Sequence, residues 1–164
     1  MRWLSLCLIT FLRVDASAQQ SRAEAEYYVA AYARHYEIPV DFVRAVVDQE
    51  SAWQRCAVSP KGAVGLMQLM PETARRLGVR DRCDLKQNVS GGVRHLAWLS
   101  TRFHGDLRLV AAAYYAGDDA VARRGLEYSN PDVVRYVARL RIRVERQRRF
   151  RSASPASAPG RQIQ

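Results

Sequence analysis

Glu50 is the residue whose type and position best suit chemistry. It ends an apolar helical pattern in the segment from Val40 to Trp53, and a glycine-containing segment follows it. Glu50 lies three, four and seven residues after Val47, Val46 and Val43, and residues at these spacings share one face of an α-helix. The pattern therefore directs the Glu50 carboxylate along an apolar face, towards the interior or the wall of a cleft.

Such a position changes what a carboxylate can do. Burial in apolar surroundings disfavours the charged form and raises the pKa of a carboxyl group. A carboxyl group that stays protonated near neutral pH can act as a general acid. Asp48 lies two residues before Glu50, so a helix places it on nearly the opposite face. The alternative is that Glu50 is an exposed or ion-paired residue at the end of a helix.

Several short segments that follow Glu50 match one family pattern in the same order. They are Glu50-Ser51, SPKGA (59–63), GLMQLMP (65–71), Thr73-Ala74 and AYYAG (113–117). Together they resemble the catalytic domain of the soluble lytic transglycosylases, the lysozyme-like SLT family, over residues 40–139. The resemblance implies a mainly α, small single-domain lysozyme-like fold. It also implies cleavage of the β-1,4 bond between N-acetylmuramic acid and N-acetylglucosamine in peptidoglycan, leaving 1,6-anhydromuramoyl ends.

By this resemblance Glu50 is the single catalytic acid and base. It would protonate the leaving oxygen and then, as a carboxylate, accept the proton of the muramic 6-hydroxyl group. Most glycosidases need two carboxylates, but here the acetamido group and the 6-hydroxyl group of the sugar would do the work of the second. The reaction needs no metal and no organic cofactor, and the cysteine and histidine spacing predicts no zinc site.

Further residues match positions that line the sugar cleft of the family. These predicted substrate-binding residues are Ser59, Gln68, Met70, Thr73, Tyr114, Tyr115 and Tyr136. The resemblance implies that Tyr114 orients the acid and that the hydroxyl group of Tyr136 reaches it. The alternative for Met70, Tyr114 and Tyr136 is a place in the core. In a supporting role, Ser51 would fix the local backbone, and Gly62 and Gly65 would allow the backbone to approach the glycan closely.

Tyr115 departs from the family pattern. The usual motif is Ala-Tyr-Asn-Ala-Gly, and Tyr115 stands in place of the asparagine. A bulky phenol would reshape a sugar subsite or stack on a sugar ring. The presence of Tyr115 therefore affects the prediction of the sugar subsites more than the prediction that Glu50 is the acid.

The charge and the first residues together predict a protein that acts in the cell envelope. The 164 residues carry a formal net charge of +10, which predicts an anionic partner such as nucleic acid, a membrane surface or a cell-wall polymer. Residues 1–18 combine Arg2, an apolar run and Ala16-Ser17-Ala18, the pattern of a signal peptide. The alternative is a frayed apolar N-terminus. An exported, periplasmic protein would not meet nucleic acid, and we expect no transmembrane helix in its mature form.

Cysteine usage agrees with export. Cys7 would leave with the signal, and Cys56 and Cys83 would remain as an even number in an oxidising compartment. A disulfide between them would contribute roughly 3 kcal/mol. The alternative is a pair of buried free thiols.

The elements that must position these residues are predicted to be helices. Apolar periodicity, proline and glycine place them at 21–37, 40–53, 71–78, 88–103, 107–115 and 130–147. The inward residues of the fourth are Val89, Val93, Leu96 and either Trp98 or Leu99. The domain is expected to span 21–147, followed by a disordered basic tail rich in Ser, Ala and Pro at 148–164.

Three functions remain open at this stage. The first is the transglycosylase, acting as a monomer on peptidoglycan glycan strands, with an envelope-spanning secretion or conjugation complex as a partner that it would serve by opening the wall. The second is a catalytically weak peptidoglycan-binding assembly protein, which the replacement by Tyr115 would favour. The third is a hydrolytic muramidase, in which water displaces the 6-hydroxyl group as the attacking group.

Overall fold

The protein is mainly α-helical, as predicted. The computed structural model describes residues 4–127 and 129–153 and has no strand among them, only two isolated bridges that join Val64 to Val58 and to Leu69. The elements in chain order are α1 (Leu4–His35), α2 (Val40–Ser51), α3 (Pro71–Arg76), α4 (Leu85–Arg102), α5 (Leu107–Ala116), α6 (Asp118–Ala122), a 3-10 helix η1 (Gly125–Glu127) and α7 (Pro131–Ala153).

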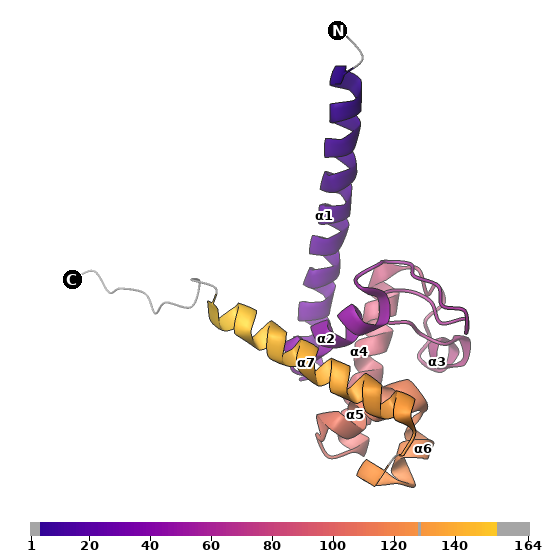
Figure 1. Cartoon of the computed structure of the whole chain (residues 1–164). Helices are drawn as coiled ribbons and strands as arrows, with labels where there is room; N and C mark the ends of the chain where they lie inside the picture. Colours follow the sequence, from indigo (N-terminus) through magenta and orange to yellow (C-terminus); the bar gives the residue numbers. More distant parts are fainter. Residues whose placement is uncertain (1–3, 128, 154–164) are drawn as a thin grey trace, which may run out of the picture.

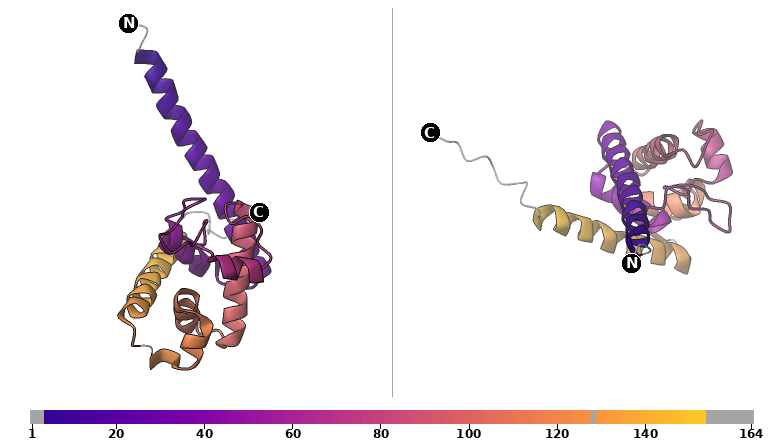
Figure 2. Two further views of the ribbon diagram at one scale, coloured as in Figure 1. Left: turned by 90° about the vertical axis from the view of Figure 1, so that its right-hand side faces the viewer. Right: turned by 90° about the horizontal axis from the view of Figure 1, so that it is seen from above.

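The helices pack around α2 and α5. Helix α2 lies against α1 and α7, while α5 contacts α4, α6 and α7 (Figure 1). The N-terminal part of α1 projects from this body in Figure 1 and in the left view of Figure 2, and the C-terminal end of α7 also extends beyond it (Figure 2). The last part of α1 is held to the body by Glu26, which pairs with Arg44 at 2.9 Å, and by Arg22, which lies over the ring of Trp53.

The core is formed by the apolar faces that the sequence pattern indicates. Val43, Val46 and Val47 of α2 are completely buried. In α4 the buried residues include Val89, Val93, Leu96 and Leu99. Of the two alternatives in that helix, Leu99 is the inward residue, because Trp98 is 44% exposed. Burial of the α2 valines fixes the rotation of that helix and hence the direction of Glu50.

Several helix boundaries differ from the predicted ones. Helix α1 begins at Leu4 instead of residue 21, because the alanine-rich segment continues the helix without a break. Helix α4 begins at Leu85, since the side chain of Asp84 caps it by accepting from the backbone N–H of Gln87 at 2.8 Å. Helix α6 and η1 were not predicted, and α7 continues past residue 147 to Ala153.

Two predictions about the ends of the chain are not tested by the structure. The signal peptide at 1–18 stays a prediction, and residues 154–164 of the predicted tail lie outside the described residues. None of the helices in the described part of the chain has the length and apolar character needed to cross a membrane.

A long irregular segment, residues 52–70, connects α2 to α3. Cys56 in this segment forms a disulfide with Cys83, which precedes α4, and their Cα atoms are 4.8 Å apart. The alternative of two free thiols is therefore wrong. The disulfide ties the segment that follows Glu50 to the start of α4.

Candidate active site

Glu50 lies in the last turn of α2, at a sharp change of chain direction. The helix ends at Ser51, and Ala52 and Trp53 both adopt left-handed conformations, with φ of 48° and 67°. Non-glycine residues in this region cost of order 1–3 kcal/mol each and cluster at functional sites. Ser51 is buried, and its hydroxyl group donates to the carbonyl of Val47 at 3.2 Å. The helix therefore stops directly after the carboxylate and leaves it beside open space.

The Glu50 carboxylate is held by α7. The hydroxyl group of Tyr136 donates a hydrogen bond to Oε1 of Glu50 at 2.5 Å. Burial raises the pKa of Glu50 to about 7, and the hydrogen bond from Tyr136 opposes that rise only in part. Glu50 is thus protonated in a large share of molecules at neutral pH, as a general acid must be.

Two hollows meet at Glu50. The first hollow has a volume of about 430 Å³ and, besides Glu50, is lined by Ser59, Lys61, Ala63, Gln68, Met70, Tyr114, Tyr115, Ala116, Asn130, Asp132 and Val133. The second hollow, of about 200 Å³, is lined by Gln49, Glu50, Tyr115, Asp132, Arg135, Tyr136 and Arg139. Only Glu50, Tyr115 and Asp132 line both, so they form the boundary between the hollows.

The first hollow brings together most of the predicted site residues. Ser59 and Gln68 also shape its wall: the Ser59 hydroxyl group accepts from the backbone N–H of Ala63 at 3.0 Å, and the Gln68 amide donates to the carbonyls of Ala57 and Gly65. Gln68 has a φ of 48°, so its own backbone turns sharply there. Met70 is 43% exposed and is therefore not a core residue.

The two neighbouring tyrosines of α5 face different partners. The hydroxyl group of Tyr114 donates to the carbonyl of Met67 at 2.7 Å, so it fixes the wall of the first hollow. Burial and the nearby charge of Glu50 raise the pKa of Tyr114, which keeps its hydroxyl group protonated. Tyr115 is 44% exposed, and its ring stacks on that of Tyr136 with centroids 4.7 Å apart. Tyr115 thus supports the side chain that holds Glu50.

The remaining predicted residues lie elsewhere. Thr73 is in the first turn of α3 and lines neither hollow. Gly65 has a φ of 90°, and a Cβ atom there would meet Asn88 Nδ2 at 2.1 Å. The structure gives this glycine a role in packing within the protein, in place of the expected approach to a glycan. Gly62 has a φ of 84° and open space where a Cβ would lie.

The family model described as "Transglycosylase SLT domain" matches residues 27–133, which include Glu50 and the whole first hollow. The chain belongs to this family. The fold and the family that the sequence motifs indicate are therefore confirmed.

Relatives of the SLT family extend the comparison. Membrane-bound lytic murein transglycosylase F of Pseudomonas fluorescens (strain Pf0-1) is 33% identical over 124 residues, which cover 70% of this chain and 26% of that protein. Membrane-bound lytic murein transglycosylase F 2 of Alkalilimnicola ehrlichii is 41% identical over 91 residues, or 51% and 20% of the two chains. The crystal structure of the 70 kDa soluble lytic transglycosylase of Escherichia coli superposes with a TM-score of 0.68 at 25% identity, covering 83% of this chain and 26% of that one. The chain thus spans about a quarter of the length of these relatives.

Asn88 positions this SLT site although the sequence patterns did not indicate it. It is completely buried in α4, where its Oδ1 accepts from the backbone N–H of Met67 at 2.8 Å. Its Nδ2 donates to the carbonyls of Val64 and Arg82, at 3.1 and 2.8 Å. The sequence did contain a signal for this role, because Asn88 is a polar residue among the apolar positions of α4. Asn88 therefore anchors the irregular segment that forms the wall of the first hollow.

Charged residues near Glu50 were also missed. Asp132 lines both hollows from the first turn of α7, and its carboxylate pairs with Arg135. Lys61 lines the first hollow, and Arg139 lines the second. The sequence places Arg135 and Arg139 four residues apart, on one face of α7, but the side of the fold that this face meets depends on tertiary packing.

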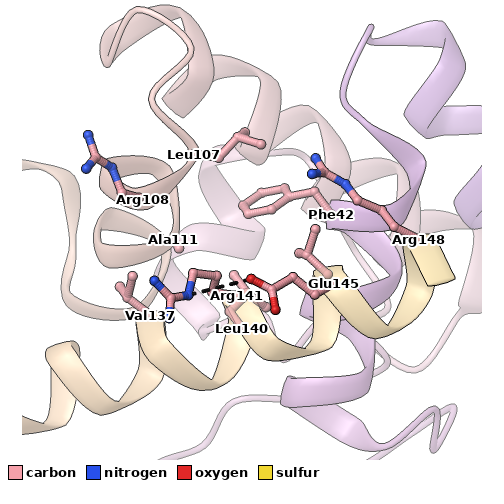
Figure 3. Close-up of a pocket in the computed structure, with 10 residues that line it drawn as sticks. Phe42, Leu107, Arg108, Ala111, Val137, Leu140, Arg141, Glu145 and Arg148 are labelled. Carbon is pink, nitrogen blue, oxygen red and sulfur yellow. Dashed lines mark ion pairs between the residues drawn. The ribbon is translucent and has the colours of Figure 1, made fainter.

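A third hollow lies at the other end of α7. It has a volume of about 310 Å³, and its apolar floor includes Phe42, Leu107 and Leu140 (Figure 3). Arg141 and Glu145 on its edge form an ion pair at 3.9 Å (Figure 3). It shares no residue with the hollows at Glu50, and its one lining carboxylate, Glu145, is paired with Arg141. It is therefore not a candidate for glycan cleavage.

Proposed function

We propose that this SLT domain is a peptidoglycan lytic transglycosylase with Glu50 as its single acid and base. It cleaves the β-1,4 bond between N-acetylmuramic acid and N-acetylglucosamine and leaves a 1,6-anhydromuramoyl end. The observation that carries this proposal is the Glu50 carboxyl group, with a pKa of about 7, at the meeting point of two hollows. The relatives named as lytic murein transglycosylases support the choice of substrate.

In the first step the protonated Glu50 carboxyl group gives its proton to the glycosidic oxygen as the C1–O bond breaks. The leaving N-acetylglucosamine keeps the oxygen and the proton as a hydroxyl group. The acetamido oxygen of the muramoyl residue stabilises the positive charge that develops at C1. The hydrogen bond from Tyr136 stabilises the Glu50 carboxylate that the step creates.

In the second step the muramic 6-hydroxyl oxygen attacks C1, and the Glu50 carboxylate accepts the hydroxyl proton. A new C1–O6 bond forms, no water is consumed, and Glu50 is protonated again. One carboxyl group thus serves both steps, because its pKa lies near the working pH. The residues of the first hollow would hold the sugar so that its 6-hydroxyl group reaches C1.

A hydrolytic muramidase is the second candidate, and Asp132 is the observation that favours it. Glycosidases with two carboxylates place both on the scissile bond, and Asp132 lines the same two hollows as Glu50. Its carboxylate is exposed and forms an ion pair with Arg135. In this case a water molecule activated by Asp132 would attack C1 and produce a reducing end.

We further propose that the protein acts outside the cytoplasm, where its disulfide can form, and opens the wall locally for a secretion or conjugation system. A catalytically weak assembly protein with the same fold is the alternative to an enzyme in that setting.

Digestion of purified peptidoglycan separates these functions. The wild-type protein, Glu50→Gln and Asp132→Asn are incubated with it, and the released muropeptides are weighed by mass spectrometry. Anhydro products from wild type and Asp132→Asn, with none from Glu50→Gln, are expected. Reducing-end products that disappear in both variants would establish the muramidase. Wall binding without release by any of the proteins would establish the assembly protein.

A further inference from the structure

The second hollow contains one cation without a partner. Besides Glu50, its charged residues are Asp132, Arg135 and Arg139. Arg135 and Asp132 neutralise each other in an ion pair. Arg139 is exposed and forms no ion pair or hydrogen bond with any residue that the structure describes. The hollow therefore presents a free guanidinium group beside Glu50.

Arg139 differs in this respect from the next arginine along α7. Arg143 is half-buried and pairs with Asp48 of α2 at 2.8 Å, so it holds the two helices together. Arg139 forms no comparable ion pair with another helix among the described residues. A cation that stabilises nothing within the fold, and that lines a hollow at the acid, is available to a ligand.

Gln49 adds a second unpartnered group to the same hollow. Its side-chain oxygen, Oε1, is buried and accepts no hydrogen bond from the described residues. A buried acceptor without a donor costs about 1–3 kcal/mol, and a ligand N–H or O–H group removes that cost. The second hollow thus offers a cation for an anion, and one of its lining residues carries an acceptor that no described donor satisfies.

We propose that the second hollow binds the carboxylate-bearing lactyl arm of the muramoyl residue, with Arg139 as the anion-binding residue. Gln49 accepts a hydrogen bond from an N–H or O–H group of the same residue. This inference rests on the proposed function, because it places a muramoyl sugar at Glu50. Guanidinium groups bind carboxylates through two parallel hydrogen bonds. The carboxylate is either the free lactyl group of a stripped strand or a carboxylate of the peptide that extends this arm.

The position of the hollow supports this assignment. Glu50 lines both hollows, so a sugar whose C1–O bond lies at Glu50 extends its substituents into one of them. In the alternating glycan strand only the muramoyl residue carries the lactyl arm. Lys61 is the cation of the first hollow, and it provides the internal comparison, because it is exposed and does not line the second hollow.

A binding experiment tests the proposal. Calorimetry gives dissociation constants for the Glu50→Gln protein and for the same protein carrying Arg139→Gln, Arg139→Lys, Lys61→Gln or Arg146→Gln. Arg146 is exposed on α7 and lines neither hollow, so its change removes an equal charge away from the site. The probes are one glycan fragment in peptide-bearing form, in peptide-free form, and with the carboxylates of each methylated. Thermal unfolding verifies that each variant is folded.

Arg139→Gln is expected to weaken binding of at least one carboxylate-bearing probe about tenfold, as the loss of a charge-assisted hydrogen bond predicts. Binding of the methylated probes should stay within about twofold, because they carry no charge for Arg139 to recognise. The probe that loses more identifies the source of the carboxylate, and Arg139→Lys should recover part of the loss.

The proposal is overturned if Arg139→Gln weakens all probes equally or none, or if Lys61→Gln or Arg146→Gln has the same selective effect. The proposed function fails separately, when wild-type protein releases nothing from peptidoglycan. The binding test does not depend on cleavage, since every protein in it lacks the Glu50 carboxyl group.

Discussion

The hydroxyl group of Tyr136 lies 2.5 Å from Oε1 of Glu50, although the two residues are 86 positions apart in the sequence. The hydrogen bond joins the last turn of α2 to the start of α7. It stabilises the ionised carboxylate and so lowers the pKa of Glu50, against the larger effect of burial. Tyr136 therefore adjusts the pH range over which Glu50 can give and accept a proton.

Replacing Tyr136 by phenylalanine should move the pH profile of the enzyme. The variant loses the hydrogen bond that lowers the pKa of Glu50, so that pKa rises further. The alkaline limb of kcat/KM, where the acid loses its proton, should shift to higher pH, and kcat should fall because the carboxylate intermediate is less stable. The profile is measured on soluble glycan from pH 5 to 10. Tyr27→Phe, at an exposed position on α1, is the control. An unchanged limb would mean that Tyr136 has a packing role only.

Glu50→Gln should stabilise the folded protein at alkaline pH. The pKa of Glu50 is about 7 in the folded state against an ordinary value of 4.5, so the folded state binds more protons than the unfolded state between these values. Stability therefore falls as pH rises from about 4.5 to 7, by roughly 3–3.5 kcal/mol in total. Glutamine carries no such cost.

Urea unfolding of both proteins at pH 4 and pH 8 measures this difference. The variant should be more stable than wild type by about 3–3.5 kcal/mol at pH 8 and nearly equal to it at pH 4. Asp48→Asn, which removes a carboxylate on the opposite side of α2, should show no gain at pH 8, because Asp48 pairs with Arg143. A difference for Glu50→Gln that is the same at both pH values would contradict the assignment of a raised pKa.

Asn88→Ala should destabilise the protein and loosen the first hollow. The change leaves the backbone N–H of Met67 and the carbonyls of Val64 and Arg82 without their partner. Each unsatisfied buried group costs about 1–3 kcal/mol, so a loss of about 3 kcal/mol or more is expected. KM should rise as well, because Tyr114 bonds to the same residue, Met67. Denaturant unfolding and steady-state kinetics measure the two effects. Gln54→Ala, at an exposed position, is the control, and a stability equal to that of wild type would show that water replaces the Asn88 bonds.

The direction of the Glu50 side chain could be predicted from the sequence, because it depends only on the spacing of the valines in the same helix. The valines of α2 are buried as their spacing indicates, and this places Glu50 at the edge of the core. The partners of Glu50 were assigned through the family motifs, since no local spacing relates α2 to α7. Asn88 was missed for a physical reason: its three hydrogen bonds go to backbone groups of a loop that has no regular structure. Asp132 was not predicted as a site residue, because its place beside Glu50 results from the packing of α7 on α2.

Tyr115→Asn, which restores the usual family residue, should change substrate binding more than it changes the acid. The Tyr115 ring stacks on Tyr136 and lies at the boundary of both hollows. Its loss removes a contact worth about 0.5–1.5 kcal/mol and joins the two hollows, so KM for glycan should change several-fold. The pH limb set by Glu50 should shift only slightly, because the bond from Tyr136 remains. Tyr115→Phe keeps the ring and should behave like wild type. If Tyr115→Asn instead abolishes kcat and shifts the pH limb as Tyr136→Phe does, the ring of Tyr115 acts chiefly by holding Tyr136 against the acid, and its contribution to substrate binding is secondary.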